Sequence, residues 1–202
     1  MRLYDNNFAP SPRRVRMFLA EKDLLVTLHA VDISTQENTS PEFLKINPLG
    51  ELPVLELDNG TYLTESLAIC RYIEVLYPEP CLMGQGTLEK AKIEAIALQL
   101  MFRIYVPSTH AFRNLHKFWA GRISQVIEYG KLARDEALNE WQRMNDLLAT
   151  QTFMAGEHFS YADIIAFTTL EFGKLSGIRV QPNQVNLTRW YNTVAARPSA
   201  KA

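Results

Sequence analysis

The sequence predicts two domains of different class, an α/β domain followed by an all-helical domain. Strand and helix signals alternate over residues 1–77, and prolines and glycines gather at 78–86. From 87 to 202 the apolar residues recur almost only at helical spacing. We therefore expect an α/β domain at 1–77, a linker at 78–86 and an all-α C-terminal domain at 87–202.

The first half of the α/β domain is predicted from short apolar patterns. RLY (2–4) begins a strand, and VTLHAV (26–31) alternates as a second strand does. Between them, Val15, Phe18 and Leu19 have the i, i+3, i+4 spacing of a helix face. Two strands joined through a helix are expected to pair in parallel.

A hairpin and a helix complete this domain. The irregular segment 40–48 predicts one helical turn, and Asn59-Gly60 then separates two apolar runs within 54–63. Asn and Gly tolerate positive φ, so this pair predicts the turn of an antiparallel hairpin. A helical stripe follows at Ile69, Tyr72, Ile73 and Leu76. The predicted order is thus β-α-β-(α)-β-β-α.

Helices are expected in the second domain at 87–105, 124–149, 161–175 and 187–196, each from its apolar stripe. The third begins with a structural signature. Ser160 stands at the N-cap position and Asp163 at N3, which is a capping-box pattern with Asp in place of Glu. Such a cap contributes about 1 kcal/mol, so we interpret Asp163 as structural rather than catalytic.

Composition excludes several classes of function. The chain has 202 residues and a net charge of −1, which does not indicate a nucleic-acid partner. Cys70 and Cys81 form no CxxC pattern and no metal-ligand cluster, so we expect no metal and no disulfide framework. No apolar run approaches the roughly 20 residues of a membrane span, and the N-terminus lacks a signal-peptide core. We expect a cytoplasmic protein without a membrane partner.

Two short segments predict a binding site for a peptide-like zwitterion. Proline at 53 cannot join a central strand ladder, and a cis Leu52–Pro53 bond would leave the Leu52 backbone to pair with an extended ligand. Thr64-Glu65-Ser66 lies between a strand and a helix, where helix N-termini attract anions. Ser66 would donate to a carboxylate and Glu65 would accept from an ammonium. The alternative is that Thr64 and Ser66 only cap the helix.

Four segments, in order, resemble the cytosolic glutathione S-transferase family in its bacterial or theta-like form. The resemblance covers nearly the whole chain, and its segments are NPLGELPVL (47–55), LTESLAICRYI (63–73), FSYADIIAF (159–167) and RWYNTVAARPSAKA (189–202). It implies a thioredoxin-like N-terminal domain, an all-helical C-terminal domain, a homodimer and glutathione as co-substrate. By the same resemblance, Leu52 and Pro53 meet the cysteinyl part of glutathione, and Glu65 and Ser66 meet the γ-glutamyl part. Glu51 departs from the Lys or Gln common at its position, so we assign it no contact.

At the residue that stabilises the thiolate, this sequence departs from the family. Members use a Tyr, Ser or Cys at the first strand-to-helix turn, and the slot that holds Ser, Thr or Cys in many relatives falls on Ala9 here. Ser11 is the nearest hydroxyl, and we predict that it is the catalytic residue. The alternative is that Ser11 is an N-cap with Pro12 at N1. Tyr4, Asn6 and Asn7 stay open as other donors to the sulfur.

The functional hypothesis is a glutathione transferase that attacks small apolar electrophiles, as in detoxification. Tyr105 and His110, near the end of the first long helix of the second domain, are predicted to line the electrophile pocket. Glutathione peroxidase or isomerase activity would use the same site. The rival hypothesis is a non-catalytic binding or regulatory module, which Ala9 favours. A third, thiol–disulfide reduction, would depend on Cys70 or Cys81.

Overall fold

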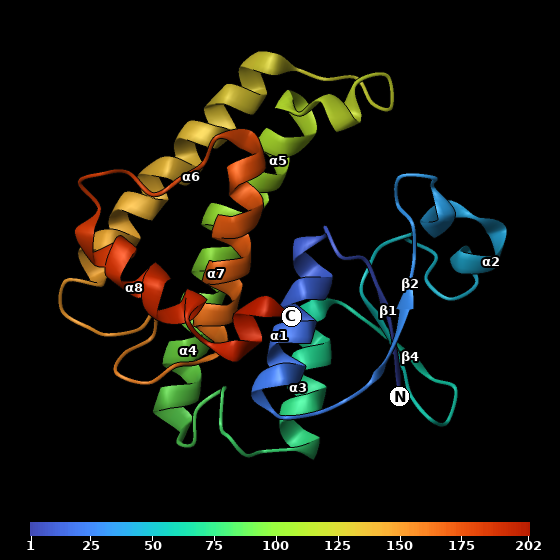
Figure 1. Cartoon of the computed structure of the whole chain (residues 1–202), viewed down its shortest axis with the longest axis horizontal. Coiled ribbons are helices and arrows are strands. Elements are labelled where there is room, and N and C mark those ends of the chain that lie inside the picture. Colours follow the sequence, from blue (N-terminus) through green and yellow to red (C-terminus); the bar gives the residue numbers. More distant parts are fainter. The chain divides into compact units, whose positions relative to one another are not determined.

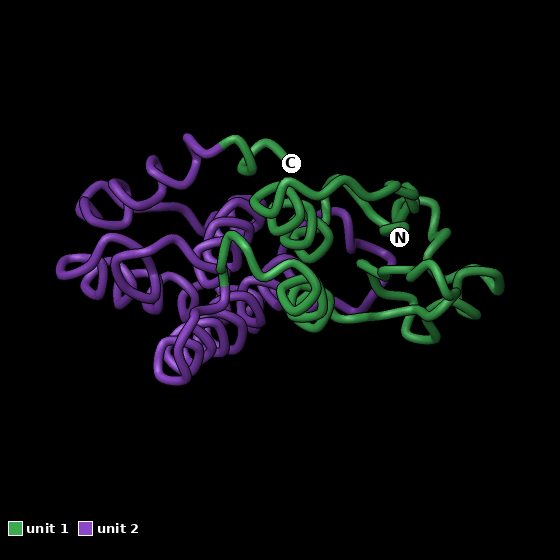
Figure 2. Tube along the Cα trace, turned by 90° about the horizontal axis from the view of Figure 1, so that it is seen from below, with its two compact units in different colours: residues 1–82, 198–202 green, residues 83–197 purple.

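A computed structural model describes all 202 residues, and the chain forms two compact units. The first comprises 1–82 together with 198–202, and the second comprises 83–197 (Figure 2). The sequence placed 78–82 in a linker and the last five residues in the helical domain, whereas in the structure both segments pack with the first unit. No helix combines the length and the apolar character that crossing a membrane requires.

The first unit is built on a mixed sheet of four strands, as the sequence predicts. The strands are β1 (Arg2–Asp5), β2 (Thr27–Ala30), β3 (Val54–Glu56) and β4 (Tyr62–Thr64), in the order β2-β1-β3-β4. β1 and β2 pair in parallel, and β3 pairs antiparallel with both β1 and β4. The β3–β4 hairpin turns at Gly60, whose φ of 80° explains the glycine there.

The two faces of this sheet are covered by different helices (Figure 1). Helices α1 (Pro10–Glu21) and α3 (Ser66–Leu76) pack together, and each buries an apolar stripe. Because side chains alternate along a strand, Tyr4 and Val54 face the other way. They form a buried cluster with Val31 and with Phe43 of α2 (Pro41–Leu44). A short 3₁₀ turn, η1 (Glu37–Thr39), precedes α2.

A buried lysine fixes the segment that follows α3. The side chain of Lys22 is fully buried just after α1, and its ammonium pairs with Glu74 of α3 at 2.5 Å. It also donates to the carbonyls of Tyr77 and Pro80, at 2.8 and 2.7 Å. These bonds compensate the desolvation of the charge. They also account for the packing of residues 77–80 with the first unit.

The second unit is entirely helical, as predicted. Its elements are α4 (Thr87–Leu100), the π-helical segment η2 (Met101–Tyr105), α5 (Val106–Leu115), the 3₁₀ turn η3 (Lys117–Trp119), α6 (Ile127–Leu147), α7 (Tyr161–Gly173), the 3₁₀ turn η4 (Lys174–Ser176) and α8 (Val185–Ala195). The helix predicted at 87–105 therefore continues for ten more residues, to Leu115 at the end of α5. It also contains the π segment η2. The changed hydrogen-bond register of a π segment leaves no pattern in the apolar residues, so the sequence does not indicate it. α5 and α6 pack closely at Gly130, where a Cβ would lie 2.8 Å from Asn114 and Leu115 atoms.

α7 is the central helix of the second unit and is buried along nearly its whole length. The predicted capping box is confirmed, since Ser160 and Asp163 bond reciprocally at its start. Asp163 also accepts from the Met154 amide and from the Trp190 indole, both at 2.8 Å. One carboxylate thus joins the N-terminus of α7 to the preceding loop and to α8. The structural interpretation of this acid is confirmed.

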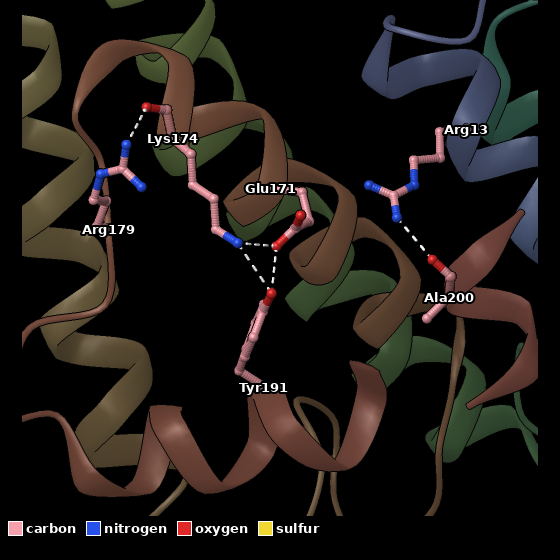
Figure 3. A network of polar contacts seen from close by, with 6 residues as sticks. All are labelled: Arg13, Glu171, Lys174, Arg179, Tyr191 and Ala200. Atoms are coloured by element: carbon pink, nitrogen blue, oxygen red, sulfur yellow. Dashed lines mark hydrogen bonds and ion pairs between the residues drawn. The ribbon is translucent and has the colours of Figure 1, made fainter. Parts of the chain in front are cut away.

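The far end of α7 is tied to α8 by a second polar network (Figure 3). Tyr191 of α8 donates to the Glu171 carboxylate at 2.6 Å. Lys174 donates to the same carboxylate and, at 3.0 Å, to the Tyr191 hydroxyl. Arg179 then donates to the backbone carbonyl of Lys174, at 3.4 Å. Both ends of α7 are therefore held to α8.

Candidate functional site

The candidate site is formed where three segments reach one edge of the sheet. In the β3–β4 ladder, Val54 pairs with Thr64, so continuing the register brings Pro53 beside Glu65. In the β1–β3 ladder, Tyr4 pairs with Val54, so the turn after β1 continues toward Leu52. The sheet itself therefore assembles the turn at 6–9, the Leu52-Pro53 segment and the start of α3.

The Leu52–Pro53 peptide bond is cis, as predicted. Leu52 is half-buried, and neither its amide N–H nor its carbonyl forms a backbone hydrogen bond elsewhere in the chain. β3 begins only at Val54, directly after the proline. A residue with both backbone groups available at the end of a strand can pair with an extended ligand in the manner of an added strand.

Glu65 has a strained backbone. Its φ of 64° and ψ of 113° lie outside the regions that L-residues ordinarily occupy, and its side chain is exposed. α3 begins at the next residue, so Glu65 is its N-cap, although its side chain makes no capping bond. The carboxylate is thus left outside the helix. Whether it meets a ligand stays a prediction.

Ser66 is buried at the first position of α3, and its hydroxyl has a partner that the sequence did not reveal. Arg14 of α1 is 1% exposed and donates from Nη1 to the Ser66 Oγ at 2.7 Å. The N-terminus of α3, a serine hydroxyl and a buried guanidinium therefore lie at one point, and each favours an anion. Arg14 was missed because arginines within an amphipathic helix ordinarily lie on the solvent side, and α1 contains three of them.

The turn after β1 is held by the backbone and by Asn6. The Asn6 amide donates to the Val31 carbonyl at 2.9 Å, and its Oδ1 accepts from the Phe8 amide at 3.0 Å. Asn7 is exposed. Asn6 is therefore engaged in shaping the turn, and its amide hydrogens point toward β2 rather than outward.

Helix α1 begins two residues earlier than the capping alternative for Ser11 requires. Its N-cap is Ala9, no side chain caps it, and Pro10 is its first residue. The reading of Ser11 as an N-cap with Pro12 at N1 is therefore wrong: Ser11 is the second residue of the helix and is half-buried. The catalytic role of Ser11 stays a prediction. Its place in the first turn puts the hydroxyl near the positive end of the helix dipole.

Tyr4 lies in β1 with its ring in the core, between Phe43 and Val54. Its hydroxyl donates to Glu56 at 3.1 Å, and burial raises the pKa of the phenol above its usual range. Glu56 lies two residues along β3 from the site edge, so the hydroxyl is directed away from that edge. This geometry does not favour Tyr4 as a donor to sulfur.

The cysteines occupy different environments. Cys70 is fully buried on α3, and burial raises the pKa of its thiol above the usual range. A buried thiol that resists ionisation is a poor nucleophile. Cys81 is half-buried and also free of a disulfide. The environment of Cys70 does not favour the thiol–disulfide reductase hypothesis.

The two residues predicted for the electrophile pocket belong to the second unit. Tyr105 is the last residue of the π segment, and its ring contacts Phe172 with a centroid separation of 6.4 Å. His110 lies one turn further on, and its Nδ1 shares a 2.7 Å hydrogen bond with the Tyr129 hydroxyl of α6. Both are half-buried. Tyr129 could not be predicted as a partner of His110, because the pairing depends on how α5 packs on α6.

Comparison with known proteins finds relatives of both units. Residues 8–76 match the model of the glutathione S-transferase N-terminal domain, and residues 128–198 match that of the C-terminal domain. The chain is 36% identical over 207 residues to glutathione S-transferase 2 of Saccharomyces cerevisiae, covering all of this chain and 88% of that protein. The crystal structure of Gtt2 from the same yeast superposes with a TM-score of 0.94 at 34% identity, covering 100% of this chain and 99% of that one.

The chain is also similar to a protein that is named as an elongation factor rather than as a transferase. Probable elongation factor 1-gamma 2 of Arabidopsis thaliana is 34% identical over 140 residues, which is 67% of this chain and 32% of that protein. The domain models and the full-length likeness to the yeast protein are the stronger findings, because they extend over both units. Together with the fold, these findings show that the chain belongs to the glutathione S-transferase family.

Proposed function

We propose that this protein is a glutathione transferase, which binds glutathione in its first unit and activates the thiol for attack on small apolar electrophiles. The observation that supports this best is the meeting of Leu52, Glu65 and Ser66 at one edge of the sheet, with Arg14 behind the serine. Glutathione is a peptide-like zwitterion, and each of these groups suits one part of it.

Binding uses the backbone at one end and charges at the other. The Leu52 N–H and C=O pair with the cysteinyl backbone, beside Pro53. The γ-glutamyl carboxylate takes the Ser66 hydroxyl and the free N–H groups at the start of α3, and Glu65 accepts from the ammonium. Arg14 adds a positive charge behind the carboxylate. The thiol is then directed to the turn at 6–9 and the start of α1.

Activation consists of stabilising the thiolate. A free thiol has a pKa near 8.5, so only a few per cent is ionised at pH 7. The N-terminus of α1 and a hydrogen bond from Ser11 both favour S⁻, and each unit of pKa corresponds to about 1.4 kcal/mol. The thiol proton passes to solvent. The sulfur lone pair forms the new S–C bond, and the leaving group departs with the electrons of the bond that breaks.

The electrophile is proposed to be small and apolar, with Tyr105 and His110 among the residues that contact it. Peroxidase or isomerase reactions would use the same thiolate. We further propose a cytoplasmic homodimer that needs glutathione as its co-substrate and no metal. No nucleic-acid or membrane partner is proposed, in keeping with the charge and hydropathy of the chain.

A second candidate is a non-catalytic glutathione-binding module. The observation that favours it is the N-cap of α1, where Ala9 offers neither a hydroxyl nor a thiol. The similarity to a protein named as an elongation factor rather than a transferase points the same way. The two candidates share the binding site and differ only in what happens to the thiol.

Retention on immobilised glutathione, followed by turnover of 1-chloro-2,4-dinitrobenzene, separates the two. The transferase proposal expects both, and Ser66→Ala should lower retention, whereas Ser124→Ala, an exposed serine of the second unit, should not. Retention without turnover would establish the module instead. Absence of retention by the wild-type protein would exclude both. Unchanged turnover in a Cys70→Ala, Cys81→Ala double variant would eliminate the reductase hypothesis.

A further inference from the structure

β2 is an edge strand of the sheet, and its outer edge has no partner. The strand order is β2-β1-β3-β4, so β2 pairs with β1 alone. The Val31 amide donates to the Asp5 carbonyl at the end of β1, at 2.8 Å. Backbone groups of successive residues in a strand face opposite edges, so His29 also faces β1. The N–H and C=O groups of Leu28 and Ala30 therefore face outward.

Nothing within the chain covers these outward groups. They take part in no hydrogen bond, and all four residues of β2 are exposed. The edge is closed only after the strand, where the Asp32 amide donates to the Glu37 carboxylate at 2.7 Å. Edge strands are ordinarily protected by a proline, a lysine or a bulge, and β2 has none of these. An open edge of this kind is a template for another strand.

A groove of about 630 Å³ lies beside this edge, between β2, α1 and the C-terminal 3₁₀ helix η5 (Pro198–Lys201). Its wall at the start of β2 is apolar and includes Leu24, Leu25 and Leu28. Leu25 is fully exposed and Leu28 is 51% exposed, which leaves apolar surface directly beside the unpaired backbone groups. A strand added to β2 would therefore bring every second side chain over this groove.

The other end of the groove is basic. Arg13 and Arg16 of α1 line it together with Lys201, and no lining side chain is acidic. Because β1 and β2 are parallel, α1 runs in the opposite direction, so its first half lies toward the end of β2. Arg13 is fixed in place, since it donates to the Ala200 carbonyl of η5 at 2.7 Å (Figure 3).

The spacing of the two ends suits an extended chain. Arg13 and Leu19, which line opposite ends, are about 9 Å apart along the axis of α1. Side chains two residues apart in a strand are about 7 Å apart. An extended segment paired with β2 thus has one side chain for the basic end and the next on that face for the apolar end.

We propose that the β2 edge docks an extended segment of an acidic partner protein, which adds to the sheet as a further strand. The segment runs antiparallel to β2, which is the more stable pairing, and bonds to the outward backbone groups of Leu28 and Ala30. An acidic side chain of the segment lies at Arg13 and Lys201, and a leucine two residues later lies on Leu28. The proposal is independent of glutathione, because none of Leu52, Glu65 and Ser66 belongs to this surface.

A second copy of this chain is the other occupant that an open edge suggests. β2 itself, Thr-Leu-His-Ala, contains no acidic residue, so a second β2 paired there would bring no carboxylate to the basic end. The charge of the groove therefore favours a partner of different sequence over self-association.

The test uses a fluorescein-labelled peptide, Thr-Glu-Thr-Leu-Thr-Leu-Thr, whose alternation places the acidic and apolar side chains on one face. Fluorescence anisotropy should show binding with a Kd below about 1 mM, with S-hexylglutathione present at saturation. The isomer Thr-Thr-Glu-Leu-Leu-Thr-Thr, which has the same composition without alternation, should bind at least tenfold more weakly. The peptide with Lys in place of Glu should bind at least threefold more weakly.

Ala30→Pro tests the strand pairing directly. Proline removes the outward N–H of this residue and leaves the bonds between β1 and β2 in place, as proline does in natural edge strands. The variant should bind the acidic peptide at least tenfold more weakly. Ala30→Ser keeps the N–H and should bind like the wild type. Circular dichroism and thermal unfolding should show both variants folded.

A charge exchange tests the basic end. Lys201→Glu should weaken binding of the acidic peptide at least threefold and strengthen binding of the Lys peptide. Lys131→Glu on α6 reverses the charge at an exposed position outside the groove, and it should change neither affinity.

The proposal is overturned if the wild-type protein binds the alternating peptide no more tightly than its isomer, or if folded Ala30→Pro binds it like the wild type. It is also overturned if Lys201→Glu leaves both affinities unchanged. Sedimentation of the protein alone should be the same for the wild type and Ala30→Pro. A change in sedimentation would assign the edge to a second copy instead.

Discussion

A single buried pair, Arg14 and Ser66, decides what the candidate site offers to an anion. A serine hydroxyl has one hydrogen to donate and two lone pairs. Because Arg14 donates to one lone pair, the hydroxyl hydrogen is directed to another acceptor, such as a ligand carboxylate. Both residues are at most 5% exposed, so the charge acts with little screening. The arginine is therefore a positioning residue for the serine.

Ser66→Ala and Arg14→Met should each weaken glutathione binding by about 10- to 100-fold, since a hydrogen bond to a charged group contributes about 1.5–3 kcal/mol. KM for glutathione should rise while kcat changes little, because the contact is made equally in the ground state and the transition state. Steady-state kinetics with varied glutathione measures both constants. In a double-mutant cycle the effects should be strongly non-additive.

Two controls distinguish loss of the contact that positions Ser66 from loss of folded structure. Arg14 is buried, so Arg14→Met is compared with Ser66→Ala by thermal unfolding, and Lys131→Met on α6 serves as the exposed control. Arg14→Lys keeps the charge and should recover part of the affinity. Wild-type KM in Ser66→Ala would contradict the assignment of this end of the site to the γ-glutamyl carboxylate.

Ser11 makes a separate prediction, because it is proposed to act on the thiol rather than on binding. Ser11→Ala should lower kcat about tenfold and raise the pKa of bound glutathione by about one unit, which corresponds to about 1.4 kcal/mol. The thiolate absorbance of the complex, followed against pH, measures this pKa directly. Since the Ser11 side chain does not cap α1, loss of a cap cannot produce the effect. An unchanged pKa and kcat would remove Ser11 from the mechanism.

At the scale of elements, the start of α7 was read correctly from the sequence, but the start of α1 was not. Ser160 and Asp163 are three residues apart, so the capping box is visible in local sequence. In α1, Pro10 and Pro12 both suit a first helical position, and the choice depends on the Asn6 turn, which bonds to Val31, the residue after β2. Local pattern cannot decide between them when a tertiary contact does.

Asp163 should also make the free energy of unfolding of the second unit depend on pH. Burial raises the pKa of its carboxyl from 3.8 to about 6, although donors from Met154, Trp190 and Ser160 oppose the rise. Because the pKa is higher in the folded state, protonated Asp163 contributes its full stabilisation below about pH 4, and this contribution is lost as pH rises through 6. The contribution to the free energy of unfolding changes by about 3 kcal/mol over this range. The free energy of unfolding should therefore decrease between pH 4 and pH 7.

Asp163→Asn isolates this contribution, because the amide does not titrate. The variant should be less stable at every pH, since one amide oxygen cannot accept all the bonds of the carboxylate. The difference in free energy of unfolding between the wild type and the variant should decrease as pH rises from 4 to 7. Urea unfolding followed by tryptophan fluorescence reports on this unit alone, because Trp119, Trp141 and Trp190 all belong to it. A difference that stays constant with pH would contradict the raised pKa of Asp163.

At the scale of the whole molecule, the sequence was sufficient for the fold class and insufficient for the pairs that complete each site. The parallel β1–β2 pair and the β3–β4 hairpin followed from the β-α-β pattern and the Asn59-Gly60 turn, which are local signals, whereas the pairing of β1 with β3 was not predicted. The pairs Arg14–Ser66 and His110–Tyr129 join residues on different elements, 52 and 19 positions apart. Such pairs depend on helix packing, and a helical stripe does not encode which polar residue meets which.

The end of the chain is a further feature of this scale. Residues 83–197 form the second unit, yet 198–202 return to the first, so the backbone passes between the units twice. η5 is held to α1 by Arg13–Ala200 and by Ser199–Glu21, and Ala200 is 6% exposed. Deleting 198–202 removes both hydrogen bonds, each contributing about 1 kcal/mol, and exposes the α1 surface beneath them.

We expect this deletion to destabilise the first unit by about 2 kcal/mol while leaving α7 and its capping box unchanged. Hydrogen–deuterium exchange should show faster exchange in α1, with α7 amides as the internal reference. The single variant Lys201→Ala, which keeps both bonds, is the control and should exchange like the wild type. Unchanged protection in α1 would mean that these contacts contribute nothing to the first unit.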